Sequence, residues 1–510
     1  MDQLLLGIDV GTTAVKAALF TLDGRLEAVH GCTYKTDYLQ ANWVEQQPNY
    51  WWEAACTAIH HVLKAIPDAR DRVLGLAVSA QAPTLLALDR AGQPIRPALI
   101  WMDRRAEAEV RELADQLGRD EIYRITGNRV DAFYVASKLR WLRNHEPDTL
   151  RTAHQFVQIN GYLNYRLTGE YSLDEAHAAL LQLRDYRSGE WSMPLCEACG
   201  VDPRQFPPIL PAHHLHGTVT AQAAEATGLR VGTPVYVGTV DGVAAAVEAG
   251  AIQPGVVAEM TGTSTVFIMP TVTPSTDPAF IALPHAIPES YLLLGAMVAS
   301  GASLNWYRDQ FGLVEQQAAQ ILDENVFDLL TRQAANAPAG SGKVIFLPYM
   351  MGERAPIWNS NARGVLFGLS LTTTRGAIIR AILEGTVYAL RHNIEVAVQA
   401  GNTITELRSV GGGTKSTVWN QLKADILGIP VRLPEASVGA PFGDAVIVGL
   451  GAGVYQDVRR DVQNMVRIKT TYEPNQATRR LYNDLYHAYR RLYDSLISEF
   501  DHLAGISNDV

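Results

Sequence analysis

The chain has 510 residues, of which 47% are hydrophobic and 19% charged, so it can build large buried cores and does not have the composition of a disordered protein. Its 43 Lys plus Arg against 53 Asp plus Glu give a formal charge of −10, and without a basic run this argues against a nucleic-acid partner. Four cysteines are too few for a disulfide scaffold. The first residues lack a basic leader and no apolar stretch is long enough to span a membrane, so we expect a soluble cytoplasmic protein without a membrane partner.

The chain opens with a predicted antiparallel β-meander. Residues 4–10 and 14–20 are apolar runs that predict two strands, and the Asp-Gly turn at residues 23–24 leads into a third. Strand-like runs then alternate with helical stretches, a pattern typical of α/β proteins. The strand-to-helix opening of a dinucleotide fold is not present.

The turn after the first strand carries the first candidate site. Asp9 ends the strand, and Gly11, Thr12 and Thr13 form the turn. Glycine permits close approach of the backbone, the threonine N–H and hydroxyl groups could hold phosphate oxygens, and the aspartate could hold a hydrated Mg²⁺. Lys16, on the returning strand, could reach back toward the turn. A plain hairpin with polar turn residues is the alternative interpretation.

A similar strand–turn–strand pattern appears in the middle of the chain. Residues 256–260 and 265–269 predict two strands that flank a turn made of Gly262, Thr263 and Ser264. This turn aligns with the first one, glycine with glycine and hydroxyl with hydroxyl. Two related lobes would show such a repetition, and a nucleotide held between the lobes would need a phosphate-binding turn from each.

The repetition also predicts where the lobes divide. Residues 248–255 contain glycine and proline and indicate a connector. We therefore expect one lobe at residues 1–250 and a second at residues 251–510. The second lobe should end in a long helix at about residues 477–499, in which tyrosines recur at helical spacing and serve packing.

Asp241 is the third candidate. It follows an apolar strand at residues 235–238 and precedes a helix of small residues. A carboxylate at the end of a strand, close to the lobe boundary, could act as a general base or as a metal ligand. It could equally be a helix N-cap, because aspartate is common at that position.

Two glycine-rich segments predict different things: one is a candidate ligand-binding loop and the other is not. Gly411, Gly412 and Gly413 follow an apolar strand and would let the backbone approach a flat ligand such as adenine or ribose, although a flexible turn has the same composition. Residues 340–343 resemble the end of a phosphate-binding P-loop. The first glycine and the final Ser or Thr of that motif are absent, so we exclude it.

Taken together and in this order, these segments resemble the FGGY carbohydrate kinase family along nearly the whole chain. Other segments strengthen the resemblance: a Trp-x-Asp-x-Arg segment at residues 101–105, a Gly-Glu-Arg-x-Pro segment at residues 352–356, and the two family signatures at residues 133–145 and 364–385. Val135 and Ala377 depart from the signatures without touching the phosphate motifs. The resemblance implies an α/β fold of two ribonuclease-H/actin-like lobes with an active-site cleft between them.

The resemblance also implies roles for individual residues. Asp241 would be the catalytic base and contact the sugar, and Asp9 would be the acid linked to Mg²⁺. The other expected contacts with ATP are Thr12, Thr13, Lys16, Gly262, Thr263, Ser264, Gly301, Gly411, Gly412, Gly413 and Ser416. The expected contacts with the sugar are Gln81, Ala82, Asp103 and Arg105. The implied reaction transfers the γ-phosphoryl group of ATP to a hydroxyl of a small sugar or polyol.

The identity of the sugar depends on a segment that departs from the family. Ala82 and Pro83 follow Gln81, where xylulokinases show Met-His and glycerol kinases show Arg-Glu. This argues against glycerol. The overall pattern is most similar to the xylulokinase branch, so we expect a ketopentose such as D-xylulose. Another ketose, a polyol or an aldonate is the alternative within the family.

A protein of another class stays open at this point. A non-catalytic actin-like ATP-binding switch or sugar sensor would share the two phosphate turns without needing Asp241 or a polar sugar site. Asp103 and Arg105 beside Gln81 favour the kinase. The sequence leaves the oligomeric state open, including a homodimer.

Overall fold

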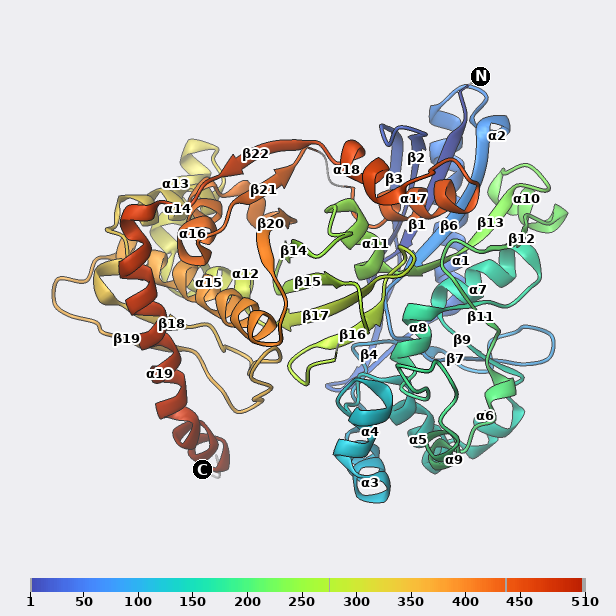
Figure 1. Cartoon of the computed structure of the whole chain (residues 1–510), viewed down its shortest axis with the longest axis horizontal. Coiled ribbons are helices and arrows are strands. Elements are labelled where there is room, and N and C mark those ends of the chain that lie inside the picture. Colours follow the sequence, from blue (N-terminus) through green and yellow to red (C-terminus); the bar gives the residue numbers. More distant parts are fainter. Residues whose placement is uncertain (1, 275, 436–437, 507–510) are drawn as a thin grey trace. The chain divides into compact units, whose positions relative to one another are not determined.

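The protein is described from a computed structural model that covers residues 2–274, 276–435 and 438–506 (Figure 1). Two compact units are present. Unit 1 comprises Met1–Ile252, Thr271–Leu292 and Val438–Val466, and unit 2 comprises Gln253–Pro270, Leu293–Ser437 and Arg467–Val510. A single cut at residue 250 therefore differs from the division seen here, because two segments from the second half of the chain belong to unit 1.

Unit 1 is built on a six-stranded sheet of order β12-β13-β6-β1-β2-β3. Strand β1 pairs antiparallel with β2 and parallel with β6, and β6 pairs parallel with β13. The opening meander is thus confirmed. The strands are β1 (Leu4–Val10), β2 (Ala14–Thr21), β3 (Leu26–Thr33), β6 (Val73–Ala80), β12 (Leu215–Thr218) and β13 (Pro234–Val240).

Shorter strands and most helices of unit 1 lie between or after these strands. The shorter strands are β4 (Asp37–Gln40), β5 (Trp43–Gln46), β7 (Leu86–Leu88), β8 (Ala98–Leu99), β9 (Gln155–Val157), β10 (Leu173–Asp174), β11 (Ile209–Leu210) and β16 (Ile281–Pro284). The helices are α1 (Pro48–Ala65), α2 (Ala69–Arg72), α3 (Glu107–Leu117), α4 (Arg119–Thr126), α5 (Val135–His145), α6 (Pro147–Thr152), α7 (Ile159–Thr168), α8 (Glu175–Leu180), α9 (Met193–Cys199), α10 (Ala221–Thr227), α11 (Asp241–Glu248), α17 (Pro441–Gly451) and α18 (Val458–Met465).

The two faces of the unit 1 sheet are covered differently. Leu4, Leu6 and Ile8 alternate along β1 and share an apolar core with residues of α1 and α7, as expected for side chains of one strand face. The opposite face is covered by α17, which the chain reaches only near its C-terminal end (Figure 1). A Cβ on Gly7 would lie 1.9 Å from the Pro441 carbonyl oxygen, so only glycine allows α17 to pack this closely on β1.

Unit 2 repeats the same arrangement of strands. Its sheet contains β17, β15, β14, β20, β21 and β22 in that order. Strand β14 pairs antiparallel with β15 and parallel with β20, β20 pairs parallel with β21, and β21 pairs antiparallel with β22. The strands are β14 (Gly255–Thr261), β15 (Thr265–Thr271), β17 (Tyr291–Met297), β20 (Ile404–Val410), β21 (Val431–Pro434) and β22 (Ile468–Tyr472). The predicted repetition of strand, turn and strand is confirmed.

The helices of unit 2 include the predicted C-terminal one. They are α12 (Ser300–Phe311), α13 (Leu313–Leu322), α14 (Val326–Asn336), α15 (Arg375–Gln399), α16 (Thr417–Leu427) and α19 (Arg479–Gly505), with a hairpin of β18 (Ile345–Leu347) and β19 (Val365–Phe367). Helix α19 begins two residues later and ends six residues later than predicted. Its tyrosines pack as expected: Tyr482, Tyr486 and Tyr489 are buried, and the hydroxyls of Tyr489 and Tyr349 lie 2.5 Å apart. None of the helices in the described part of the chain combines the length and apolar character needed to cross a bilayer.

Candidate active site

Asp9 occupies the end of β1, in the middle of the unit 1 sheet. It pairs with Lys16 on β2 and with Ser79 on β6. The Asp9 carboxyl is buried, and its Oδ1 has no hydrogen-bond partner among the described residues. Burial raises the pKa of Asp9 to about 6, and the nearby positive charge of Lys16 partly opposes that rise. A buried carboxyl with an open oxygen at the end of a strand is suited to holding a cationic or proton-donating group.

The turn that follows Asp9 is held in place from several elements. Its backbone closes through a hydrogen bond from Gly11 N to Ala14 O of 3.0 Å. Thr12 O accepts from Gln46 Nε2 at 2.8 Å, and Thr12 Oγ1 accepts from Trp101 Nε1 at 3.1 Å. Thr13, by contrast, is exposed. The turn is therefore fixed on its inner side and open on its outer side.

Asp241 is the first residue of α11, immediately after β13. The N-cap position is Val240, and no side chain caps this helix. In the described part of the chain, Asp241 Oδ1 accepts a hydrogen bond from the adjacent Gly242 N alone, at 2.6 Å. The N-cap alternative therefore does not fit, because a capping side chain bonds the second or third N–H of the helix. Desolvation raises the pKa of Asp241 to about 7, and the negative charge of Asp9 adds to the rise. A partly exposed carboxyl that titrates near neutral pH has the properties of a general base.

A third carboxyl, that of Asp444, lies next to these two and was missed by sequence reasoning. It comes from α17, is fully buried, and accepts a hydrogen bond of 2.7 Å from Ser79 Oγ through its Oδ2. Its Oδ1 has no partner within residues 2–274, 276–435 and 438–506. Burial raises the pKa of Asp444 well above its ordinary value, and the charges of Asp9 and Asp241 raise it further. The signal that could have revealed it is an acid inside an otherwise apolar helix.

These carboxyls meet the chemical requirements of a Mg²⁺ site only in part. Magnesium is usually held by one or two carboxylates, with waters and substrate phosphates completing the coordination. The open oxygens of Asp9 and Asp444 fit that description. No group of three or more His, Cys, Asp or Glu side chains in the described residues is arranged to hold a metal directly. Asp9 therefore fits as a residue that would hold a hydrated ion together with phosphate oxygens.

Gln81 connects the Asp9 turn to the predicted sugar-binding segment. Its backbone N donates to Val10 O at 2.9 Å. Its side-chain Nε2 donates to Gln46 Oε1 at 2.8 Å and to the Tyr34 hydroxyl at 3.4 Å. Its Oε1 is buried and has no partner among the residues that the structure describes, so one acceptor remains available to a ligand. Ala82 beside it is only partly buried. Of the supporting residues, Trp101 belongs to the Trp-x-Asp-x-Arg segment, whereas Gln46 and Tyr34 have no sequence signature of their own.

The side chains of Asp103 and Arg105 form an ion pair with each other and do not face an open space. Arg105 Nη2 lies 2.8 Å from Asp103 Oδ2 and 2.8 Å from Glu45 Oε1, and both partners are buried. Asp103 Oδ2 also accepts from Val44 N at 2.7 Å. The guanidinium lies 4.1 Å from the centre of the Trp43 ring. With its oxygens already engaged, Asp103 is better placed to fix this segment than to bind a hydroxyl directly.

In unit 2 the Gly262 turn meets the start of α12. Gly262 N donates to Ser264 O at 2.9 Å, and Ala302 N donates to Thr263 O at 2.9 Å. A Cβ on Gly301 would lie 2.2 Å from Gly262 O, so glycine is required at Gly301 for this contact. Gly262 and Thr263 are exposed. The first helical N–H groups of α12 and the turn thus lie together, an arrangement that suits a phosphate group.

The Gly411–Gly413 loop lies against the same turn. Cβ atoms added at Gly411 and Gly413 would each be 2.8 Å from atoms of Thr261, which directly precedes Gly262. Gly411 also has a φ of 86°, a conformation that favours glycine. Ser416 Oγ accepts from Trp419 N at 3.2 Å and caps α16. The structure therefore brings the predicted nucleotide-binding residues of unit 2 together, with Ser416 also fixing the helix behind the loop.

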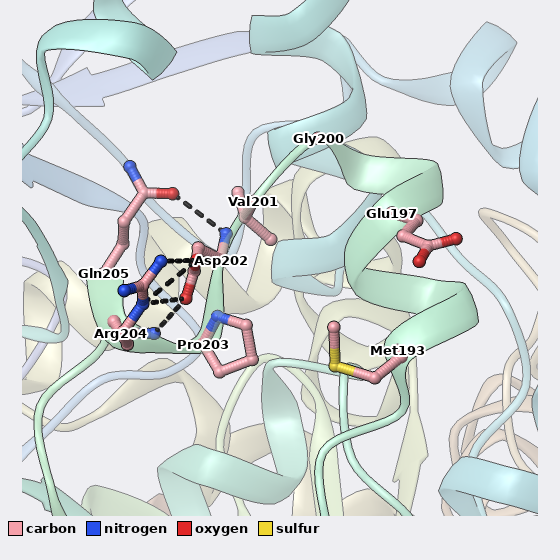
Figure 2. Close-up of a pocket in the computed structure, with 8 residues that line it drawn as sticks. All are labelled: Met193, Glu197, Gly200, Val201, Asp202, Pro203, Arg204 and Gln205. Carbon is pink, nitrogen blue, oxygen red and sulfur yellow. Dashed lines mark hydrogen bonds and ion pairs between the residues drawn. The ribbon is translucent and has the colours of Figure 1, made fainter.

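Two other features do not belong to this site. Gly340 N and Ser341 Oγ both bind the Glu384 carboxylate, at 3.1 and 2.8 Å, so this P-loop-like segment is occupied by the protein's own acid. An open hollow of about 570 Å³ is lined by residues of α9 and the turn after it, which are drawn in Figure 2. The predicted site residues do not line it, and its charged groups Asp202 and Arg204 pair at 2.6 Å.

Comparisons with known proteins agree with this fold. The FGGY family of carbohydrate kinases matches with its N-terminal domain at residues 4–248 and with its C-terminal domain at residues 257–452. The crystal structure of xylulose kinase from Rhodospirillum rubrum superposes with a TM-score of 0.91 at 32% identity, covering 98% of this chain and 100% of that one. The chain is 29% identical to the xylulose kinase of Staphylococcus epidermidis over 97% of both chains, and 27% identical to the gluconokinase of Bacillus subtilis over 99% of this chain and 98% of that protein.

A two-unit α/β fold with repeated sheets, a carboxylate at the end of a strand and paired glycine turns defines a phosphotransferase of the sugar kinase type. The chain belongs to the FGGY family of carbohydrate kinases. The predicted family, fold class and enzyme class are confirmed.

Proposed function

We propose that this kinase phosphorylates a ketopentose, D-xylulose first, with ATP as the phosphoryl donor. The observation that carries the proposal is the partly exposed Asp241 carboxyl, which shares unit 1 with Asp9 and whose pKa is raised to about 7 by desolvation. The xylulose kinases among the relatives, similar over nearly their whole length, support the choice of sugar.

In the proposed mechanism Asp241 removes the proton from the attacking sugar hydroxyl. The proton moves to a carboxylate oxygen as the new bond between oxygen and phosphorus forms and the bond to ADP breaks. Gln81 orients the sugar through its open Oε1. The exposed Lys16 lies beside Asp9 and offers a positive charge to phosphate oxygens. Mg²⁺, when bound, neutralises phosphate charge, and Asp9 would hold it.

Unit 2 supplies most of the proposed contacts with ATP. The Gly262–Thr263 turn, Ser264 and the start of α12 at Gly301 would bind phosphate oxygens through backbone N–H and hydroxyl groups. The glycines of the 411–413 loop lie next to that turn and leave space for the adenosine portion. Ser416 would support this loop through its cap on α16.

A gluconate kinase is the second candidate, because gluconokinases are about as similar to the chain as some xylulose kinases. An aldonate carries a carboxylate, which would need a positive partner in the sugar site. The cation that the sequence predicts there, Arg105, is already paired with Asp103 and Glu45. This pairing favours a neutral sugar.

A coupled assay of ADP formation with a panel of pentuloses, hexuloses, polyols and aldonates tests the proposal. We expect the highest kcat/KM with D-xylulose and negligible turnover with glycerol or in water alone. Replacing Ala82 and Pro83 together by Met and His should change the order of the sugars if this segment lines the site. A preference for gluconate over every ketopentose would make the second candidate correct.

A further inference from the structure

The Gly-Glu-Arg-x-Pro segment at residues 352–356 has no part in the functions assigned above. Its acid, Glu353, lies in unit 2 after β18, where Glu353 and Asn359 form an isolated β-bridge through two hydrogen bonds of 2.9 Å. The Glu353 side chain is buried. A buried carboxyl costs free energy unless hydrogen bonds compensate it, so its partners indicate why it is present.

Those partners belong to the connection between β17 and α12. Glu353 Oε1 accepts from Val298 N at 2.7 Å and from its own neighbour Arg354 N at 2.9 Å. A backbone hydrogen bond of 3.1 Å from Ala355 N to Ala296 O runs alongside. Val298 is two residues before the first residue of α12. The segment is therefore hydrogen-bonded to the connection between β17 and α12 just before the helix begins.

The start of α12 leaves little room for movement. The N-cap position, Ala299, has no side-chain hydrogen bond to the helix, so capping does not fix the entry of the chain. Gly301 packs on Gly262 O so closely that even a Cβ would overlap, and Ala302 N bonds Thr263 O at 2.9 Å. A shift of Val298 would be passed through two residues to this contact.

We propose that Glu353 is a positioning residue of the nucleotide site, which holds Val298 so that the first turn of α12 stays against the Gly262–Thr263 turn. The inference rests on the proposed binding of ATP by unit 2. Glu353 acts through α12 and does not itself touch ATP. What the role requires is an acceptor oxygen at this point, rather than a negative charge.

The chemistry of the carboxyl agrees with this requirement. Burial raises the pKa of Glu353 to about 7, although the two N–H donors and Arg354 oppose the rise. Both protonation states keep an oxygen that can accept from Val298. A glutamine in its place would keep the same oxygen, whereas alanine would leave the N–H of the partly buried Val298 without this partner.

Calorimetric titration of the full chain with ATP alone and with D-xylulose alone tests the proposal. For Glu353→Ala we expect about tenfold weaker ATP binding, the size of effect expected when one hydrogen bond is lost, with D-xylulose binding unchanged. Glu353→Gln should bind both ligands as the wild type does. Hydrogen exchange should show faster exchange of the Val298 amide in the alanine variant.

The control is Glu384→Ala, which removes another buried carboxylate of unit 2 that accepts a backbone N–H, from Gly340. It should lower the melting temperature without changing ATP affinity. If Glu353→Ala does not fold, Glu353→Asp, which withdraws the oxygen from Val298 but keeps the charge, should show the same selective loss.

Unchanged ATP affinity in a folded alanine or aspartate variant would overturn the proposal, as would an equal loss in Glu353→Gln. Failure of the wild type to bind ATP would instead overturn the proposed function.

Discussion

Each of the two sheets contains an acid paired with a serine on the neighbouring parallel strand, but the charges around the two pairs differ. In unit 1, Asp9 on β1 pairs with Ser79 on the parallel strand β6; in unit 2, Glu259 on β14 pairs with Ser409 on the parallel strand β20. The third residue differs. Lys423 of α16 lies 2.8 Å from Glu259 Oε2 and 2.8 Å from Ser409 Oγ.

In unit 1 the third residue is another acid, although the acids of the two clusters are not at matching positions: the alignment of the two glycine turns places Ile8, and not Asp9, opposite Glu259. Asp444 bonds Ser79, and its charge would repel those of Asp9 and Asp241. A neutralised cluster stabilises the strands around it, whereas a cluster of like charges keeps carboxyls poised to take up a proton or a cation. The comparison shows how similar acid–serine pairs can give a charge-neutralised, structural cluster in one unit and, in the proposed mechanism, a reactive cluster of like charges in the other.

The largest expected effect is on the base of the reactive cluster. Asp241→Asn keeps the shape of the side chain but removes proton acceptance, so kcat should fall by about 10²–10⁴-fold. ATP affinity, measured by calorimetry, should change little because Asp241 is not among the proposed ATP contacts. Near-normal turnover of the asparagine variant would exclude Asp241 as the base.

A substitution in the structural cluster of unit 2 should change the stability of the protein. Lys423→Met leaves the buried Glu259 carboxylate without its positive partner, which typically costs about 3–5 kcal/mol of unfolding free energy. Denaturant unfolding measures the loss. Adding Glu259→Gln should restore much of the stability, because the remaining groups are then neutral. A loss below about 1 kcal/mol in the single variant would show that the pair is not a stabilising one.

A substitution in the exposed Gly262–Thr263 turn of unit 2 should change the affinity for ATP without changing stability. A Cβ on Gly262 meets no atom within 4 Å in the described part of the chain, so Gly262→Val should fold normally. Its branched side chain would occupy the space of phosphate oxygens, and ATP binding should weaken by roughly tenfold or more as backbone hydrogen bonds are lost. D-xylulose binding is the control. Unchanged ATP affinity would remove this turn from the nucleotide site.

The smallest effect concerns the pH dependence of stability in unit 1. The folded-state pKa of Asp444 is raised, so the native protein holds this proton more tightly than the unfolded chain does, and stability falls as pH rises above the ordinary aspartate pKa. The Asp444→Asn variant has no carboxyl at this position, so it does not lose stability in this way as pH rises. Its melting temperature should exceed that of the wild type by a margin that grows from pH 5 to pH 8, about 2–4 °C for each kcal/mol. A margin that shrinks with pH would contradict the raised pKa.

Local patterns carried much of the fold and of the site. Apolar runs, the Asp-Gly turn and the repeated glycine turns predicted the two meanders, and Asp241 was found from its place between a strand and a small-residue helix. Asp444 could not be found in this way. Its partner Ser79 is 365 positions away in the chain, and their contact depends on how closely α17 approaches β1.

Contacts between distant parts of the chain also explain why the surroundings of two predicted sugar contacts, Asp103 and Arg105, could not be predicted. Asp103 and Arg105 are polar and follow a tryptophan, which favoured a ligand-binding interpretation. Sequence alone could not show that Glu45, Val44 and two tryptophan rings already surround them. Whether a polar side chain faces a ligand or another residue is decided by tertiary packing, which local patterns do not contain.

The place of α17 on β1 also affects how the protein is made. During synthesis on a ribosome, residues 1–252 emerge long before residues 438–466, which complete unit 1. All six strands of the unit 1 sheet precede residue 241, but until α17 is made the face of β1 that bears Gly7 and Asp9 lacks its covering helix. The nascent chain therefore carries a sheet with one uncovered face through the synthesis of most of unit 2. Folding of unit 1 therefore waits for a contact of very long sequence separation, the kind that slows folding and exposes unfinished chains to aggregation.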